Sequence, residues 1–410
     1  MKAITFLGTT QYKLTTYVYR GQEYETELFA ETLPHFFPDL ERVLVFVTPT
    51  VQQHPNLAAL GERLGERLQP VPIPRGRSEE ELWAIFDALT GAVDEGETVL
   101  FDITNSFRSI PLLVFLAAAY LRTARQVRLR GVIYGAFEAR DATNRSPVFD
   151  LTPFVGLLDW LTATNQFIYT GDARYLAHLL EKEGQSRRSN ALRQAGESLR
   201  DLSLAMMLCR PLEVMGRAGG LGRALARAQA ALAQGARPFG LLAGRVEREY
   251  AARALPEPTA GQNVEASLRH QLDLIRWYLD NNQVIQAMTL AREWVVTAVG
   301  WRLGRGFVLS PPARKALERG LNGLIRVGRE GKDGTVFTGA DLNDEGQILW
   351  NWPEREALRD LWAHLPNVRN ELNHAGMRTS RMKAAKIARQ AGQEIRPRLE
   401  ALAQSWKLLE

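Results

Sequence analysis

The segment ETVLFDITNSFRSIPLLVFLAAAYL, residues 97–121, determines the fold of the first third of the chain. Its first part, ETVLFDIT (97–104), is an apolar run that is typical of a buried strand in a parallel sheet. Its second part, from Ile110 to Leu121, has the length and composition of a helix. Comparable strand-like runs are AITFLG (3–8), VLVFVT (43–48) and GVIYGAFEA (131–139). The alternation of strands and helices over residues 1–150 predicts an open, doubly wound α/β sheet.

From about residue 151 onward the strand signal nearly disappears, and helical periodicity predicts an all-α region. Two long helical patterns are expected at about 263–280 and 283–303, and a glycine-rich polar stretch at 319–348 is expected to be mostly loop. Two amphipathic helices should follow it. Their apolar stripes have 3,4,3,4 spacing and are Leu358, Leu361, Leu365, Val368 and Leu372, then Ile395, Leu399, Leu402, Trp406 and Leu409.

The composition is that of an ordinary globular protein with two or three domains, since 45% of the 410 residues are hydrophobic and 24% are charged. Cys209 is the one cysteine, which excludes a disulfide framework and a cysteine-based zinc site, and is consistent with the reducing cytoplasm. The longest apolar run, Pro111 to Leu121, is too short to span a bilayer. The net charge of +5 favours polyanionic partners. The arginine-rich stretch 186–250 fits either an RNA-facing surface or a solvated helical face.

Polar residues follow three of the predicted strands. They are Gly8, Thr9 and Thr10 after the first, Thr48 after the second, and Thr104, Asn105 and Arg108 after the third. In open α/β sheets, ligands bind beyond the carboxyl ends of the strands, and a helix N-terminus there favours anions. Arg108 has the guanidinium that pairs bidentately with phosphate. No dinucleotide fingerprint and no phosphate-binding P-loop motif is present. A well-capped turn without a ligand remains the alternative for residues 102–109.

A second polar group is Arg369-Asn370-Glu371-Leu372-Asn373-His374. Metal-independent RNA cleavage needs a proton donor and acceptor near neutrality, for which histidine is suited, and a fixed cation, for which arginine is suited. Asn370 and His374 share a helix face, whereas Arg369 lies about 140° away from His374. A two-fold partner would complete such a site. Pro366 predicts either a kink or a new helix that has Arg369 and Asn370 in its first turn. The alternative is an ordinary polar helix surface.

The first 180 residues resemble the sensor (CARF) domain of CRISPR-associated ancillary proteins that accompany type III interference complexes. The matching stretches are FLGTTQYKLTTYVY, VLVFVTPT, RSEEELWAIFDAL, FDITNSFRSIPLLVFLAAAYL, IYGAFEAR, PVFDLTPFVGLLDWL and TGDARYL. The resemblance implies a Rossmann-like fold, a two-fold dimer and a cyclic oligoadenylate activator, with cyclic tetra-adenylate expected. It implies activator contacts at Gly8, Thr9, Thr10, Thr48, Thr104, Asn105 and Arg108. The sequence departs from the family at Asn105-Ser106, where glycine is frequent at the second position.

The motif Arg369-Asn370-x3-His374 is similar to the R-x4-6-H motif of HEPN ribonucleases. This resemblance implies a CARF domain at 1–170, a helical linker at 171–260 and a HEPN domain at 261–410. Arg369, Asn370 and His374 would then cleave single-stranded RNA in antiviral defence without a metal or other cofactor, in a homodimer or an assembly of dimers. Two alternatives are a non-catalytic sensor that binds nucleic acid or protein through its helices, and a sensor domain that degrades its own activator.

Overall fold

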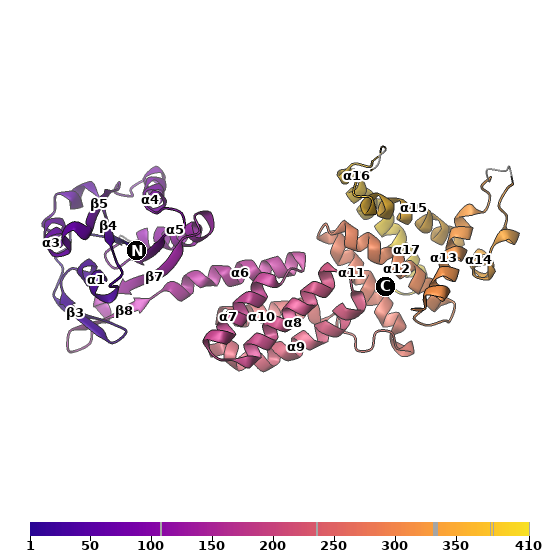
Figure 1. Cartoon of the computed structure of the whole chain (residues 1–410), viewed down its shortest axis with the longest axis horizontal. Helices are drawn as coiled ribbons and strands as arrows, with labels where there is room; N and C mark the ends of the chain where they lie inside the picture. Colours follow the sequence, from indigo (N-terminus) through magenta and orange to yellow (C-terminus); the bar gives the residue numbers. More distant parts are fainter. Residues whose placement is uncertain (107–108, 235–236, 331–334, 378, 380, 410) are drawn as a thin grey trace. The chain divides into compact units, whose positions relative to one another are not determined.

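A computed structural model of the chain describes residues 1–410 except 107–108, 235–236, 331–334, 378, 380 and 410. The chain divides into two compact units, Met1–Asp159 and Trp160–Glu410. The first is an α/β unit and the second is helical (Figure 1), which confirms the predicted fold class. The further division at residues 170 and 260 stays a prediction.

The first unit is built on one eight-stranded mixed sheet with the order β3-β2-β8-β7-β6-β1-β4-β5. Its strands are β1 (Lys2–Phe6), β2 (Thr15–Tyr19), β3 (Gln22–Thr26), β4 (Arg42–Val47), β5 (Leu68–Pro72), β6 (Thr98–Asp102), β7 (Arg128–Gly135) and β8 (Arg145–Asp150). The four predicted strands form the parallel centre, β7-β6-β1-β4. The pairs β2–β3 and β7–β8 are antiparallel, so the sheet is mixed.

Helices cover both faces of this sheet. Successive side chains of its central strands point to opposite faces, so each face has its own apolar core. Ala3 belongs to one core, with side chains of the helices between β3 and β5, and Ile4 belongs to the other, with α4 and α5. The helical segments are η1 (Phe29–Thr32), α1 (Leu33–Phe36), α2 (Pro49–Gln52), α3 (Pro55–Leu64), η2 (Gly65–Arg67), α4 (Glu79–Gly91), α5 (Ile110–Ala124) and η3 (Phe137–Ala139). Ser78 caps α4, since its hydroxyl accepts a hydrogen bond from the Glu81 amide.

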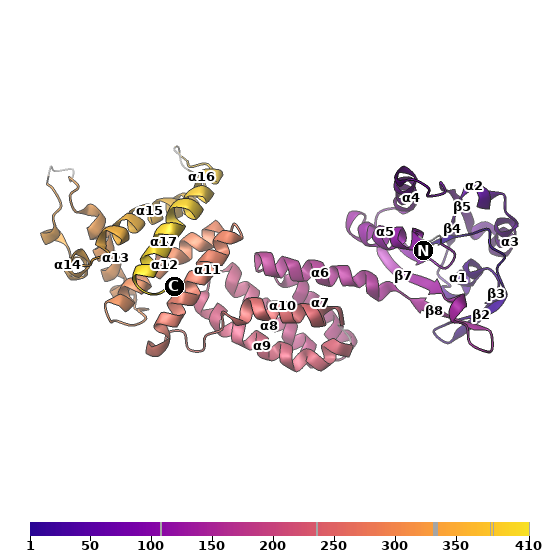
Figure 2. The same cartoon turned by 180° about the vertical axis from the view of Figure 1, so that it is seen from behind.

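Helix α6 (Thr152–Thr170) contains the boundary between the units, and antiparallel helices follow it in the second unit. These are α7 (Arg174–Ser186), α8 (Asn190–Met207), α9 (Pro211–Gln234) and α10 (Arg237–Ala251). They lie side by side (Figure 2). The remaining segments are η4 (Gly261–Asn263), α11 (Val264–Asp280), α12 (Val284–Arg302), α13 (Pro311–Arg326), η5 (Gly339–Asp341), α14 (Asp344–Trp350), α15 (Arg355–Asn373), α16 (Ala384–Arg389), η6 (Gln390–Ile395, a π-helix) and α17 (Arg396–Ser405).

One apolar core runs through the second unit, and it includes the stripes predicted for the last two helices. Buried hydrogen bonds join its elements: the Tyr278 hydroxyl donates to the Met206 carbonyl at 2.6 Å, and the Trp294 indole donates to the Leu268 carbonyl at 2.9 Å. Within the described part of the chain, no helix is long and apolar enough to cross a bilayer.

The expectation that 319–348 is mostly loop is partly wrong, because α13 continues to Arg326 and α14 begins at Asp344. Two glycines explain the error. A Cβ on Gly320 would lie 2.9 Å from the Gly346 amide nitrogen, and a Cβ on Gly323 would lie 2.6 Å from the Leu342 side chain. These glycines permit close helix packing and do not mark turns.

Candidate functional site

The polar residues after the predicted strands meet at one edge of the sheet. Gly8, Thr48 and Thr104 follow β1, β4 and β6, which are adjacent parallel strands with the order β6-β1-β4. Their carboxyl ends therefore point the same way, and this is where α/β sheets bind ligands. Thr48 is buried, whereas Thr9 and Thr10 are exposed. The structure thus brings the described members of the predicted set, all except Arg108, to one edge.

The loop after β1 is held in place by two side chains that the sequence analysis did not single out. The Gly8 amide donates to the Tyr12 hydroxyl at 2.8 Å. The Asn56 side-chain amide donates to the carbonyls of Gly8 and Thr10, each at 3.0 Å. Asn56 lies on α3, so the loop is fixed by a helix far from it in sequence. Such cross-links cannot be seen in local sequence patterns.

Asp102 fixes the loop after β6 from inside the sheet. Its side chain is fully buried and accepts hydrogen bonds from the Thr5 hydroxyl at 2.5 Å and the Thr104 amide at 2.9 Å. Burial raises the pKa of this carboxyl group to about 6. The Thr104 hydroxyl in turn accepts the Gly135 amide at 2.8 Å and ties the loop to β7. Asp102 therefore positions the loop and does not itself reach a ligand.

Asn105, in the same loop, has a side-chain amide without a partner among the described residues. Its amide nitrogen is buried and has no hydrogen-bond partner among the described residues. An unsatisfied buried donor costs about 1–3 kcal/mol, and a bound acceptor would remove that cost. Arg108, the predicted phosphate contact, lies outside the described residues, and its role stays a prediction.

The second candidate group lies at the end of α15, which α12 and α13 hold in place. The Trp362 indole donates to Asn322 on α13 at 2.9 Å, and the Arg292 guanidinium of α12 lies 5.7 Å from the centre of the Trp362 ring. The helix runs continuously through Pro366. The expectation that Pro366 starts a new helix is therefore wrong, and Arg369 and Asn370 do not lie in a first helical turn.

His374 is the residue at which α15 ends. Its amide donates to the Asn370 carbonyl at 3.0 Å, and the next two residues, Ala375 and Gly376, have positive φ angles of 49° and 73°. This left-handed turn stops the helix and leaves the His374 side chain exposed. Since α15 is continuous, Arg369 points about 140° away from His374 around the helix axis.

The three motif side chains differ in their polar contacts from Arg359 of α15. Over the residues that the structure describes, no hydrogen bond or ion pair involves the side chain of Arg369, Asn370 or His374. By contrast, Arg359 on the same helix donates to the Val327 carbonyl at 2.9 Å. Within the described residues, an arginine, an amide and a histidine are therefore left available to a substrate.

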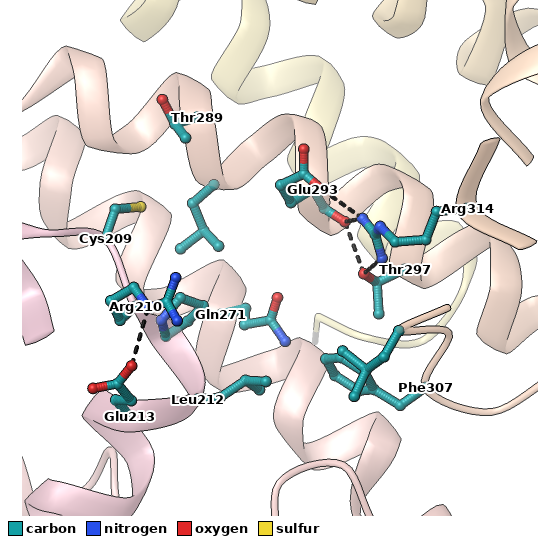
Figure 3. Close-up of a pocket in the computed structure, with 13 residues that line it drawn as sticks. Cys209, Arg210, Leu212, Glu213, Gln271, Thr289, Glu293, Thr297, Phe307 and Arg314 are labelled. Carbon is teal, nitrogen blue, oxygen red and sulfur yellow. Dashed lines mark hydrogen bonds and ion pairs between the residues drawn. The ribbon is translucent and has the colours of Figure 1, made fainter. Parts of the chain in front are cut away.

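A separate cavity of about 300 Å³ lies between the α8–α9 junction and helices α11 and α12 (Figure 3). Its charged side chains are paired: Arg210 with Glu213 at 3.0 Å, and Arg314 with Glu293 at 2.6 Å. Burial raises the pKa of the Cys209 thiol to about 11, so this thiol is protonated at neutral pH. The cavity thus combines paired charges with a protonated thiol, and it contains none of the residues predicted for either site.

Metal ligation finds no support in the described residues, which contain no group of three or more His, Cys, Asp or Glu side chains that could hold an ion. His270 on α11 and His364 on α15 are half-buried. Burial lowers the pKa of His270, and the His364 ring contacts the Asp360 carbonyl at 2.8 Å.

Comparisons with known proteins match the helical middle of the chain. Residues 156–253 match the model of the second domain of CRISPR-associated protein MJ1674. CRISPR-associated protein MJ1674 from Methanocaldococcus jannaschii is 32% identical over 114 residues, which are 27% of this chain and 18% of that protein. The chain therefore spans only a small part of this relative's length.

Among solved structures, Enterococcus italicus Csm6 bound to cyclic hexa-2'-fluoro-hexa-dAMP is aligned with 100% of this chain and 95% of its own chain, at 8% identity and a TM-score of 0.42. A TM-score this low does not establish a shared fold. The sequence matches show that the helical middle region is similar to a domain of a CRISPR-associated protein.

Proposed function

We propose that the chain is a cyclic oligoadenylate-activated endoribonuclease that cleaves single-stranded RNA in type III CRISPR antiviral defence. The first unit is the CARF sensor, and residues 261–410 form a HEPN ribonuclease domain. The observation that carries this proposal is the end of α15, where Arg369, Asn370 and His374 are available and unpaired within the described part of the chain.

The proposed reaction is an attack by the ribose 2′-oxygen on the adjacent phosphorus. The 2′-hydroxyl loses its proton, the bond from 2′-oxygen to phosphorus forms, the bond from phosphorus to 5′-oxygen breaks, and the leaving oxygen takes up a proton. His374 transfers or orients the proton of the 2′-hydroxyl. Arg369 stabilises the charge on the phosphoryl oxygens, and Asn370 orients one of these groups. The products are a 2′,3′-cyclic phosphate and a 5′-hydroxyl.

The activator is proposed to bind the sheet edge, with cyclic tetra-adenylate as the expected ring. The fixed loop at Gly8–Thr10, the buried Thr48 and the unpartnered amide of Asn105 support this placement. A rigid site loses little conformational freedom when it binds, which favours affinity.

A homodimer is proposed to complete both sites. Helix α5 exposes Leu112, Leu116 and Tyr120 along one face, with 64%, 47% and 54% of each side chain accessible. Tyr120 contacts Phe86 of α4, and Phe86 contacts the exposed Trp83. A contiguous apolar surface of this kind marks an interaction site. A second copy is the occupant that a symmetric ring-shaped ligand requires, and it would supply the Arg369 that one chain cannot aim.

The proposal is tested by incubating the purified protein with end-labelled single-stranded RNA in excess EDTA, with and without cyclic tetra-adenylate. We expect cleavage only when the activator is present. Cleavage that stops on chelation would contradict the metal-independent mechanism. Tight activator binding with no cleavage of any RNA would favour the non-catalytic sensor instead.

A further inference from the structure

We propose that a cavity beside Asn370 recognises one nucleobase of the RNA, and that it selects bases with an exocyclic amino group over uracil. This inference rests on the proposed ribonuclease function. The cavity has a volume of about 340 Å³ and lies between α15 and the π-helix η6. Its polar lining comes from α15, with His364, Asn367, Asn370 and Glu371, and from η6, with Gln390 and Glu394.

The lining has more hydrogen-bond acceptors than donors. Glu371 accepts the Met382 amide at 3.0 Å. The Gln390 side-chain oxygen is buried and has no partner among the described residues. The Gln390 amide nitrogen lies 3.5 Å from a carboxylate oxygen of Glu394, and no ion pair of Glu394 occurs in the part of the chain that the structure describes. A buried acceptor without a partner points to a ligand that donates hydrogen bonds.

The π-helical turn explains how two of these acceptors come to face α15. Residues Gln390–Ile395 form a wider turn than an α-helix between α16 and α17. Such turns are uncommon and occur frequently at functional sites. Here the turn places Gln390 and Glu394 in one cavity with Asn370. The local irregularity therefore belongs to the cavity that carries the unpaired acceptor.

The charge of the cavity decides what class of group it takes. Two carboxylates, Glu371 and Glu394, line it together with His364, whose ring lies 3.2 Å from the Asp360 carboxylate, whereas no arginine or lysine does. Such a lining suits a neutral base better than a phosphate, so we assign the phosphate of the RNA to Arg369 outside the cavity. A volume of about 340 Å³ is within the range of small-ligand sites and accommodates a single base.

Nucleobases differ in the donors that they present to such a lining. Adenine, cytosine and guanine carry an exocyclic amino group, for which carboxylate and amide oxygens are suitable acceptors. Uracil presents two carbonyl acceptors and one N–H. Its carbonyl oxygens would therefore face the carboxylate and amide oxygens of the cavity, which are also acceptors. A site built for a hydrogen-bond donor rejects an analogue that lacks the donor, because its buried polar groups then stay unpaired.

The position of Asn370 connects this cavity to the cleavage site. Asn370 lines the cavity and shares a helix face with His374, four residues later. The recognised base therefore belongs to a nucleotide next to the scissile phosphate. Single-stranded RNA has unstacked bases that can turn into such a pocket.

The test uses 2′-O-methyl RNA with a single 2′-hydroxyl nucleotide, so that cleavage occurs at one bond. The base is varied among A, C, G and U at that nucleotide and then at its 3′ neighbour. Rates are measured in EDTA with cyclic tetra-adenylate. We expect amino-bearing bases to be cleaved at least about tenfold faster than uracil at one of the two positions. Equal rates for all four bases at both positions would overturn the pocket and leave the ribonuclease intact.

Two variants assign the preference to the cavity. Glu394→Gln replaces an acceptor oxygen with a donor, and Gln390→Leu removes the buried acceptor, so each should lower the ratio of amino-base to uracil cleavage. The control is Glu356→Gln, an exposed carboxylate at the start of α15 outside the cavity, which should leave the ratio unchanged. A preference that both cavity variants retain in full would place base recognition elsewhere.

A binding measurement keeps the inference testable when no RNA is cleaved. Fluorescence anisotropy compares labelled oligo-A, oligo-C and oligo-U with the wild-type protein in EDTA. Tighter binding of oligo-A or oligo-C, weakened by Glu394→Gln, would support the pocket although the ribonuclease proposal had failed. Equal binding of the three oligomers would overturn the pocket as well.

Discussion

The sheet edge and the end of α15 differ in how many of their site residues are held in place by contacts within one chain. At the sheet edge, the loop at Gly8 is fixed by Tyr12 and Asn56, and Thr104 is fixed by Asp102 and Gly135. At the end of α15, the three motif side chains make no hydrogen bond or ion pair with other described residues. A site that is rigid in one chain is suited to binding, whereas an open set of side chains needs a partner to become a catalytic site.

This contrast indicates where regulation would act. Because Arg369 and His374 point in different directions on a continuous helix, dimer geometry would decide whether they meet across two chains. An activator at the sheet edge could change activity by changing that geometry, without touching the motif.

The largest effect is expected from the motif. Arg369→Ala and His374→Ala should each reduce activator-dependent RNA cleavage by at least about 10²-fold, because each removes a group that acts in the transition state. Calorimetric binding of cyclic tetra-adenylate should be unchanged. The matched controls are His178→Ala on α7 and Arg187→Ala at the C-cap of α7, which should cleave like the wild type. If both motif variants also cleave like the wild type, the motif is a coincidence.

The next effect concerns the apolar face of α5. Leu116→Glu places a charge on this face and should shift light scattering from a dimer towards the 46.0 kDa monomer, with loss of cleavage at the same protein concentration. Ile285→Glu, a similarly exposed apolar position on α12, should leave the dimer intact. A monomeric Leu116→Glu protein with full activity would show that one chain suffices.

A smaller effect is expected at the sheet edge. Arg108→Ala should weaken the binding of cyclic tetra-adenylate by about 1.5–3 kcal/mol, which is typical of a lost charged hydrogen bond. Titration calorimetry measures it, and Arg67→Ala on η2 serves as the control. The purified variant should still cleave RNA at saturating activator. Unchanged affinity would remove Arg108 from the site.

The last prediction concerns the free energy of unfolding and its dependence on pH through Asp102. The raised pKa of Asp102, about 6, means that between about pH 4 and pH 6 the folded state holds a proton that the unfolded state has lost. Stability should therefore fall as the pH rises through this window, by about 2 kcal/mol from this group. Asp102→Asn should flatten the dependence in denaturant titrations, whereas Asp39→Asn at an exposed position should not. An unchanged slope in Asp102→Asn would contradict the raised pKa.

The sequence predicted the centre of the sheet and the last helices because their apolar periodicity is strong. It missed β5 because the residues LQPVP include two prolines, which argue against a strand. The prolines are tolerated because β5 is an edge strand, where a missing N–H breaks no hydrogen bond of the sheet. It also missed β2 and β3, whose polar alternation is weak, and it took the glycines of α13 for turn residues. Local patterns do not show which glycine packs against a neighbouring helix.

The candidate sites show the same limit. The residues after β1, β4 and β6 could be predicted to meet because parallel strands end at one edge. The roles of Asn56 and Asp102 could not, because they depend on burial and on contacts between distant segments. The cavity beside Asn370 depends on the π-helical turn at Gln390–Ile395, which no sequence pattern announced.

The most direct test of the account compares two RNAs that differ by one oxygen atom. Both are 2′-O-methylated except at one nucleotide, which carries a 2′-hydroxyl in the first and a 2′-hydrogen in the second. In EDTA with cyclic tetra-adenylate, we predict cleavage of the first RNA at that nucleotide, with a 2′,3′-cyclic phosphate end identified by mass spectrometry, and no cleavage of the second. Equal cleavage of the two RNAs would contradict the attack by the 2′-hydroxyl and the roles given to Arg369 and His374.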